Sequence, residues 1–154
     1  FSKRHEGHFG SAMYLFLEKP LIGHGPKLFR KLCNENEYTF FDSAICSTHP
    51  HNTYFQLLAE TGIIGTMPIL LILFYVLFIF LRQFISIIFN KKQYLMDYQV
   101  CLYSCVLITL WPLVPSFQFF NNWISLLYFL PVPFLLSKKI YNEINENSNK
   151  NETF

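Results

Sequence analysis

Apolar residues are distributed very unevenly along this chain and dominate its second half. The run from Thr61 to Leu81 contains no charged residue, and residues 69–81 are all aliphatic or aromatic. About 20 apolar residues, rising about 1.5 Å each, cross a hydrocarbon core of about 30 Å. A buried helix of a soluble protein is the alternative, but such a helix is rarely this long and apolar on every side. The pattern therefore predicts a membrane-spanning helix over about residues 63–89.

A second uncharged stretch runs from Tyr98 to Ser137. It is about twice as long as one crossing needs, so it predicts two further helices, over about residues 98–116 and 122–140. Proline, serine and asparagine between them mark the turn, and Trp111 and Trp123 on either side are typical of a membrane interface. Pro131 and Pro133 predict a kink in the last helix, for which a re-entrant segment is the alternative.

The first third of the chain is polar, carries all 5 histidines and predicts short helices and turns. Residues 11–18 have the pattern of an amphipathic helix at an interface, which Lys19-Pro20 would end. Residues 21–26 predict a tight turn, since Gly23 and Gly25 are free to adopt positive φ. The short helix expected next presents cations on one face: Lys27, Arg30 and Lys31.

Composition narrows the class of protein further. Of 154 residues, 52% are apolar and only 14% are charged, against about 25% charged in an average soluble protein. This balance excludes an ordinary soluble domain, a disordered chain and a disulfide-dense secreted scaffold. The net charge of +2, without a basic run, gives no indication of nucleic-acid binding. Because the chain begins at Phe1 and not at Met, we expect the C-terminal part of a longer protein.

These patterns predict an all-α integral membrane protein, a fragment of a multi-span helical bundle. We expect residues 1–62 to form an outward-facing loop of short helices, residues 63–137 the three membrane helices, and residues 138–154 a polar tail. Cationic short loops stay in the cytoplasm. Basic residues follow the first and third helices, whereas the turn at Asn121 has none, so we expect the loop and this turn outside and the tail inside. The basic residues that set this orientation are Arg82, Lys91, Lys92, Lys138 and Lys139.

Three strings carry a resemblance to a known family. The first is His51-Asn52 followed by Leu-x-Glu-x-Gly-Ile-Ile-Gly65, directly before the first membrane helix. The second is Arg4 followed by Pro20-Leu-Ile-Gly-His-Gly25, and the third is Phe119-Phe-Asn-Asn-Trp-Ile-Ser125. In this order they resemble the O-antigen ligase and O-antigen polymerase superfamily.

The resemblance implies a multi-pass enzyme of the bacterial inner membrane with a periplasmic catalytic loop. Such an enzyme transfers or polymerises a glycan carried on undecaprenyl diphosphate, in the synthesis of lipopolysaccharide or another surface polysaccharide, without a metal or other cofactor. The acceptor is a lipid A core sugar for a ligase and a lipid-linked repeat for a polymerase, and both remain open. Other classes also remain open: a flippase or transporter of lipid-linked oligosaccharides, and a membrane anchor with an interaction loop.

The family pattern carries His51 and Arg4 over as the catalytic pair. Their chemistry suits the task, because a histidine with a pKa near 6.5 can accept the proton of the acceptor hydroxyl. An arginine offers a fork of donors to diphosphate oxygens. We expect substrate contacts from His49, Asn52, Lys27 and Arg30. Asn52 is alternatively the N-cap of a helix, and the two cations alternatively anchor the loop to lipid head groups.

The remaining candidates concern metals and cysteines. The pairs His5-x-x-His8 and His49-x-His51 do not have the spacing of a known zinc framework, so no metal is expected. Cys33 and Cys46 lie in the outward loop, where a disulfide between them would close a short loop; whether it forms is left open. Cys101 and Cys105 lie one turn apart on the second membrane helix, and we expect them to be small packing residues.

Overall fold

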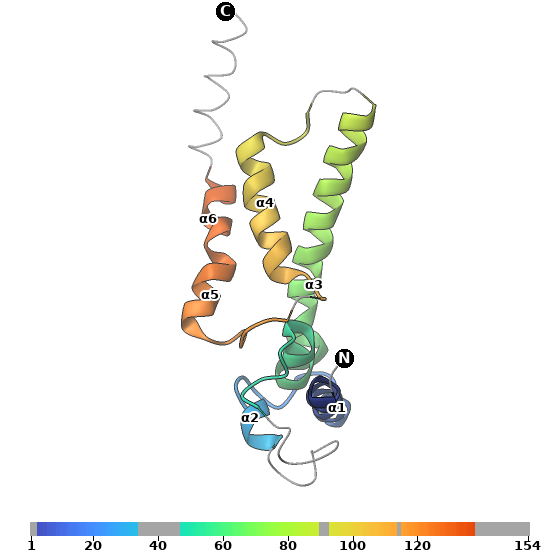
Figure 1. The fold of residues 1–154 in the computed structure, drawn as a ribbon, viewed down its shortest axis with the longest axis vertical. Coiled ribbons are helices and arrows are strands. Elements are labelled where there is room, and N and C mark those ends of the chain that lie inside the picture. Colours follow the sequence, from blue (N-terminus) through green and yellow to red (C-terminus); the bar gives the residue numbers. More distant parts are fainter. Residues whose placement is uncertain (1–2, 34–46, 90–92, 114, 138–154) are drawn as a thin grey trace, which may run out of the picture.

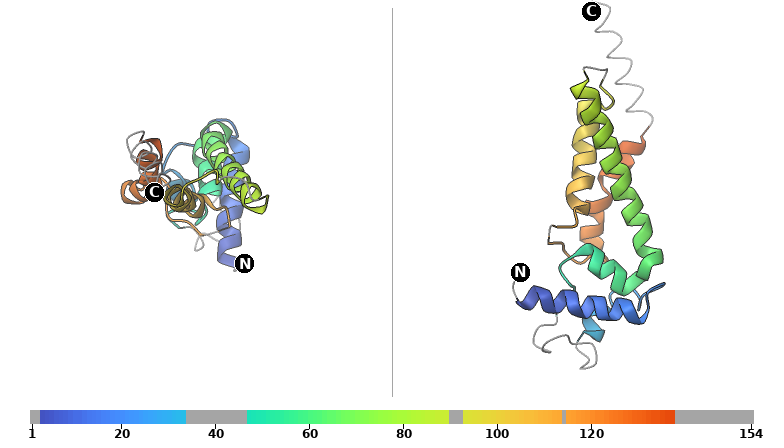
Figure 2. Two further views of the ribbon diagram at one scale, coloured as in Figure 1. Left: turned by 90° about the horizontal axis from the view of Figure 1, so that it is seen from above. Right: turned by 90° about the vertical axis from the view of Figure 1, so that its right-hand side faces the viewer.

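The computed structural model of the chain describes residues 3–33, 47–89, 93–113 and 115–137, and in these ranges every regular element is a helix. The long part of α3, helix α4 and the pair α5–α6 run side by side, whereas α1 lies across their common direction at one end (Figures 1 and 2). This confirms the all-α class. The six helices are α1 (Lys3–Glu18), α2 (Phe29–Leu32), α3 (Thr53–Ile88), α4 (Asp97–Leu110), α5 (Asn122–Phe129) and α6 (Pro131–Leu136).

Helix α3 begins ahead of the predicted membrane helix and bends where that helix was expected to start. Asn52 caps its N-terminus, as asparagine often does. Its side-chain oxygen accepts hydrogen bonds from the amide of Tyr54 at 3.0 Å and from that of Phe55 at 3.2 Å. At Gly62 the backbone leaves the helical region, with φ 62° and ψ −164°. The predicted span of residues 63–89 therefore corresponds to the part of α3 after this kink.

Helix α3 has the surface of a membrane-spanning helix. Within the described residues it is the one helix long and apolar enough to cross a bilayer, and only 22% of its most apolar stretch is buried. Leu73, Val76 and Ile79 are buried, while Leu71 and Phe78 on other faces are exposed although they are apolar. The core helix of a soluble protein would be buried along most of its length. Exposed apolar faces of this kind suit lipid.

The other two predicted crossings are shorter than expected. Helix α4 stops at Leu110 and not near residue 116, because Pro112 has no amide to donate and favours an extended residue before it. Trp111 is accordingly extended, with ψ 123°. The third helix is divided into α5 and α6 at Pro131, where the sequence predicts a kink. Both apolar segments, Asp97–Leu110 and Asn122–Leu136, fall below the length of a full crossing. The positions from residue 138 onward, including the predicted tail, lie outside the described residues.

Two clusters of buried apolar residues hold the helices together. One joins α1, α2 and the start of α3, and is formed by Ala12, Leu15, Phe29, Cys33 and Ala59. The other joins α3 to α4 and lies within the long bundle, and is formed by Leu73, Val76, Val106 and Leu110, with Leu135 of α6 packed against it. The first cluster thus places the polar N-terminal segment on the end of α3, and the second builds the bundle.

The turn after α1 is inserted into the kink of α3. In an unbroken helix the amides of Ile63 and Ile64 would donate to the carbonyls of Ala59 and Glu60. Here those amides donate to the carbonyls of Pro20 (2.8 Å) and Leu21 (3.1 Å) instead. The carbonyls of Ala59 and Glu60 accept from the amides of residues 24 (3.1 Å) and 25 (2.8 Å). All four backbone groups freed by the kink are therefore paired with the turn, as buried backbone groups must be.

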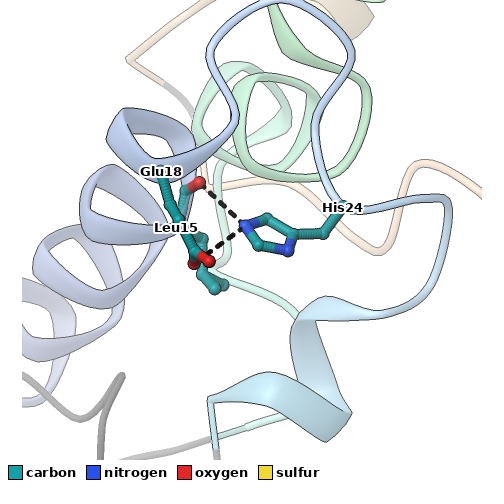
Figure 3. Close-up of polar contacts among 3 residues, drawn as sticks. All are labelled: Leu15, Glu18 and His24. Atoms are coloured by element: carbon teal, nitrogen blue, oxygen red, sulfur yellow. Dashed lines mark hydrogen bonds and ion pairs between the residues drawn. The ribbon is translucent and has the colours of Figure 1, made fainter.

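His24 fixes the other side of this turn to α1. Its Nε2 lies 3.0 Å from the carbonyl oxygen of Leu15 and 3.4 Å from a carboxylate oxygen of Glu18, both in the last turn of the helix (Figure 3). A histidine at this place satisfies a terminal carbonyl and interacts favourably with the negative end of the helix dipole. Lys19-Pro20 ends α1 as predicted, but the helix begins at Lys3, earlier than the predicted residue 11.

Candidate functional site

His51 has an unusual backbone conformation at the start of α3. Its φ is 57°, in the left-handed region that is uncommon for residues other than glycine. Its carbonyl accepts a hydrogen bond from the amide of Ser116 (3.0 Å), and Asn52 directly after it caps the helix. Backbone strain that the surroundings hold in place is found preferentially at functional sites. The backbone of the predicted catalytic histidine is thus held by the hydrogen bond from Ser116 and by the capped start of α3.

Three histidine rings meet at this point. The ring centroids of His49 and His51 are 4.3 Å apart, and those of His8 and His51 are 5.5 Å apart. His49 and His51 come from the segment before α3, whereas His8 comes from α1. His8 is 3% exposed and His49 is 8% exposed. His49 and His51 were predicted from the sequence as site residues, and the fold adds His8.

The hydrogen bonds of His49 show which of its ring nitrogens carries the hydrogen. Its Nε2 lies 3.2 Å from the carbonyl oxygen of Ser116. A carbonyl can only accept, so Nε2 carries the hydrogen. Its Nδ1 lies 2.9 Å from the hydroxyl of Thr48, which can donate to it. Burial lowers the pKa of His49 below 6.5, the neighbouring His51 lowers it further, and the bond to Ser116 opposes both. A neutral ring with its hydrogen on Nε2 satisfies all of these contacts.

A small pocket opens beside His51. It has a volume of about 150 Å³ and is lined by His51, Asn52, Phe9, Phe55, Pro112, Leu113 and Pro115. A larger cavity of about 430 Å³ lies along α3, and its lining is apolar except for Tyr54 and Thr66. Pro112 lines both. Both spaces are lined mainly by apolar side chains, to which the smaller one adds the polar groups of His51 and Asn52.

The connection between α4 and α5 lies against the segment that carries the histidines. The side-chain amide of Asn52 donates to the carbonyl of Pro112 (2.7 Å), and the hydroxyl of Tyr54 donates to that of Leu110 (2.6 Å). The end of α4 and the start of α5 therefore lie at the same end of the bundle as the N-terminus of α3 (Figure 1). Asn52 acts as the helix cap, which confirms the structural interpretation of this residue; a substrate contact stays a prediction.

Gln56 and Glu60 form a buried pair of hydrogen-bonded side chains that was not predicted from the sequence. Gln56 is 0% and Glu60 is 1% exposed. The Gln56 amide donates to Glu60 (3.1 Å), whose other carboxylate oxygen accepts from the amide of Phe29 (3.0 Å). The side-chain oxygen of Gln56 accepts from the amide of Phe119 (2.9 Å). Two polar residues four apart on an otherwise buried helix face were the only signal in the sequence.

The two cations expected to bind substrate lie elsewhere. Arg30 is in α2, and Lys27 precedes this helix with a φ of 64°, so the expected single helix face is not formed. The amide of Phe29 beside them contacts Glu60, about two helical turns along α3 from Asn52. Neither cation lines the pocket beside His51. Their contact with substrate stays a prediction.

Arg4 and the cysteines are described only in part. Arg4 lies in the first turn of α1, four residues before His8, and its side chain is outside the described part.

Cys33 is buried and disulfide-bonded, but Cys46 lies outside the described residues, so their pairing stays a prediction. Cys101 and Cys105 were expected to be small packing residues, but both are exposed on α4 and are not buried against the other described helices. Within the described ranges, no three metal-binding side chains lie close enough together to hold an ion.

Part of the chain matches a known protein family. Residues 8–70 match the sequence model of the family described as O-antigen ligase. This range includes His8, the inserted turn, His51 and the kink of α3, but neither Arg4 nor the connection before α5. No curated protein and no solved structure matches the chain. The family match and the long apolar helix α3 together indicate a membrane protein with an O-antigen ligase-like or polymerase-like function, and they confirm the predicted resemblance for residues 8–70.

Proposed function

We propose that this chain belongs to a membrane glycosyltransferase that moves a glycan from a polyprenyl diphosphate carrier to a sugar hydroxyl. The reaction takes place at the outer face of the bacterial inner membrane, in the synthesis of lipopolysaccharide or another surface polysaccharide. The observation that carries the proposal is the imidazole of His51, which lines a pocket at the end of the bundle with its backbone held in a left-handed conformation.

In this mechanism His51 serves the acceptor. The acceptor hydroxyl oxygen attacks the anomeric carbon of the donor glycan, and the bond from that carbon to the diphosphate oxygen breaks. The carrier diphosphate leaves with the electron pair, and the hydroxyl proton passes to the imidazole of His51. An imidazole side chain can accept such a proton near neutral pH. The mechanism needs no metal, because the charge of the leaving group can be met by an arginine.

Arg4 is the residue that we assign to the diphosphate. The backbone of α1 places it one helical turn from His8, and the ring of His8 contacts that of His51. Residues four apart on a helix share a face. The guanidinium and the imidazole thus come from backbone positions that allow them to act on the two ends of the bond that breaks.

The apolar cavity along α3 suits the carrier. Its lining by leucines, Phe74 and Trp111 would accept part of an isoprenoid chain, with the bond that breaks held near the imidazole of His51. Because Pro112 lines both the cavity and the pocket, the two spaces are adjacent. Whether the acceptor is a lipid A core sugar or a second lipid-linked repeat depends on parts of the site beyond these residues.

The test uses the purified full-length protein in lipid nanodiscs, with a polyprenyl-diphosphate glycan and a sugar acceptor. His51→Ala should lower the release of carrier diphosphate by about 100-fold or more. His24→Ala is the matched control, since His24 contacts the end of α1 and not the pocket, and it should keep the wild-type rate. Full activity of His51→Ala would refute the proposed role. Movement of the lipid-linked glycan across vesicles without release of diphosphate would show a transporter instead.

A further inference from the structure

His8 is a buried ionisable side chain that the proposed reaction does not use. It comes from α1, is 3% exposed, and its ring lies 5.5 Å from that of His51 at an angle of 56°. Burying an imidazole costs free energy that an apolar residue at the same place would not. Its location beside the candidate base therefore needs an explanation beyond the packing of α1.

The position of His8 is fixed by its neighbours. The ring of Phe9, the next residue, stacks on that of Phe55 in α3 at 4.6 Å with an angle of 11° between the planes. Ala12 and Leu15, one and two turns further along α1, are buried in the cluster that joins α1 to α3. Helix α1 therefore cannot rotate about its axis without breaking these contacts, and the imidazole of His8 is held against His51.

We propose that His8 is a positioning residue, which holds the imidazole of His51 toward the pocket from the side of α1. The inference rests on the proposed function, because it assigns His8 a task in the same reaction. His51 contacts the ring of His8 from α1 and that of His49 from its own segment. Two rings in contact leave the imidazole little freedom to turn away from the pocket that it lines.

The same contacts place a second ionisable ring beside His51. Among the described side chains, the titratable groups near His51 are His8 on α1, His49 in its own segment and Tyr54 on α3, whose hydroxyl is bonded to Leu110. The α4–α5 connection, residues 111–121, contains no titratable side chain. A second imidazole that can carry charge makes protonation of His51 less favourable. Removing it should therefore raise the pH at which His51 takes up its proton.

The experiment compares His8→Phe and His8→Asn with wild type in the full-length protein. His8→Phe keeps an aromatic ring, and His8→Asn keeps a polar group; neither can carry charge. We expect kcat to fall about tenfold in His8→Asn, which loses the ring, and less in His8→Phe, which keeps one, with KM unchanged, because the base is less well oriented. In both variants the acid limb of the pH–rate profile should move upward by about 0.5 pH unit or more. His24→Phe is the control and should change neither quantity.

A second readout does not depend on turnover. The rate at which diethyl pyrocarbonate modifies His51, followed by peptide mass spectrometry against pH, reports when this ring is neutral. The same upward movement is expected in both His8 variants. Wild-type kcat and an unchanged profile in both readouts would overturn the inference, and so would lower stability without a change in pH dependence. If His51→Ala were fully active, the proposed function itself would fail, whatever the His8 variants do.

Discussion

Gly23 lies against the backbone just before Gly62, and Gly62 lies against the backbone just before Gly23, where the turn after α1 enters the kink of α3. A Cβ atom on Gly23 would lie less than 3.0 Å from the backbone of Glu60 and Thr61, and one on Gly62 equally close to that of Leu21 and Ile22. Both glycines also have positive φ, 65° and 62°. The Gly-x-Gly turn and the Glu-x-Gly string, which resemble the family separately, are thus the two sides of one contact.

The first prediction concerns this contact. Gly62→Ala should lower the free energy of unfolding by about 2 kcal/mol or more, because alanine is strained at this φ and its Cβ would collide with backbone that cannot move aside. Thermal unfolding of the detergent-solubilised protein measures it. Ile22→Ala in the same turn is the control, since this side chain is 69% exposed. Wild-type stability of Gly62→Ala would contradict the interlocked turn.

The second prediction concerns Gln56. Gln56→Leu removes the donor to Glu60 and the acceptor for the Phe119 amide, and leaves both of these buried groups without that partner. We expect the free energy of unfolding to fall by about 2–3 kcal/mol. Gln93→Leu, at an exposed position, should cost little.

A double-mutant cycle of Gln56→Leu with Glu60→Gln separates the link from its parts. The two substitutions should not be additive, because they remove the same hydrogen bond. Additive effects would show that Gln56 and Glu60 stabilise the protein independently.

The third prediction concerns pH. Burial and the neighbouring His51 lower the pKa of His49 below 6.5 in the folded protein. As the pH falls through about 6.5, His49 takes up a proton in the unfolded chain but not yet in the folded protein. The free energy of unfolding therefore decreases as the pH falls, until the pH is below the pKa of His49 in the folded protein. The unfolding temperature measured from about pH 7.5 to about pH 5 should show this decline. It should be smaller in His49→Gln; an equal decline in that variant would assign the effect to another group.

The fourth prediction concerns orientation in the membrane. Helix α2 and the start of α4 lie at opposite ends of the molecule (Figure 1). Lys31 in α2 and Gln93 shortly before α4 are both exposed. In a background with Cys101→Ser and Cys105→Ser, a membrane-impermeant maleimide should label Lys31→Cys on intact cells. Gln93→Cys should react only after lysis, because it adjoins the basic pair Lys91-Lys92 in the sequence. The reverse result would place the histidine cluster in the cytoplasm and exclude the proposed site of reaction.

Much of the local structure was predictable from the sequence. The apolar run of α3, the end of α1 before Pro20, the two positive-φ glycines of the turn and the Asn52 cap all follow from rules that act over a few residues. The kink at Gly62 was not, because a single glycine in a helical pattern is often tolerated without a break. It is the distant turn at residues 20–25 that makes the break favourable, by pairing the freed backbone groups.

The site was predictable only where its residues are neighbours in sequence. His49, His51 and Asn52 stand in one string, and the fold brings them together. His8 reaches the same point from α1, and Phe119 reaches Gln56 across 63 residues, through contacts that leave no local pattern. Lys27 and Arg30 were expected to contact substrate from their charge alone, and charge does not fix where a helix lies: neither residue lines the pocket beside His51.

The inserted turn also has a consequence for how the protein is made. Residues 20–25 leave the ribosome before residues 59–64, so the partners for the broken stretch of α3 already exist when it emerges. Without these partners the same stretch would pair its own amides and carbonyls in a continuous helix, because each unmatched group at the edge of the lipid costs several kcal/mol. The bend therefore forms only when the turn is in place, and damage to the turn should straighten α3 where it enters the bilayer during biogenesis.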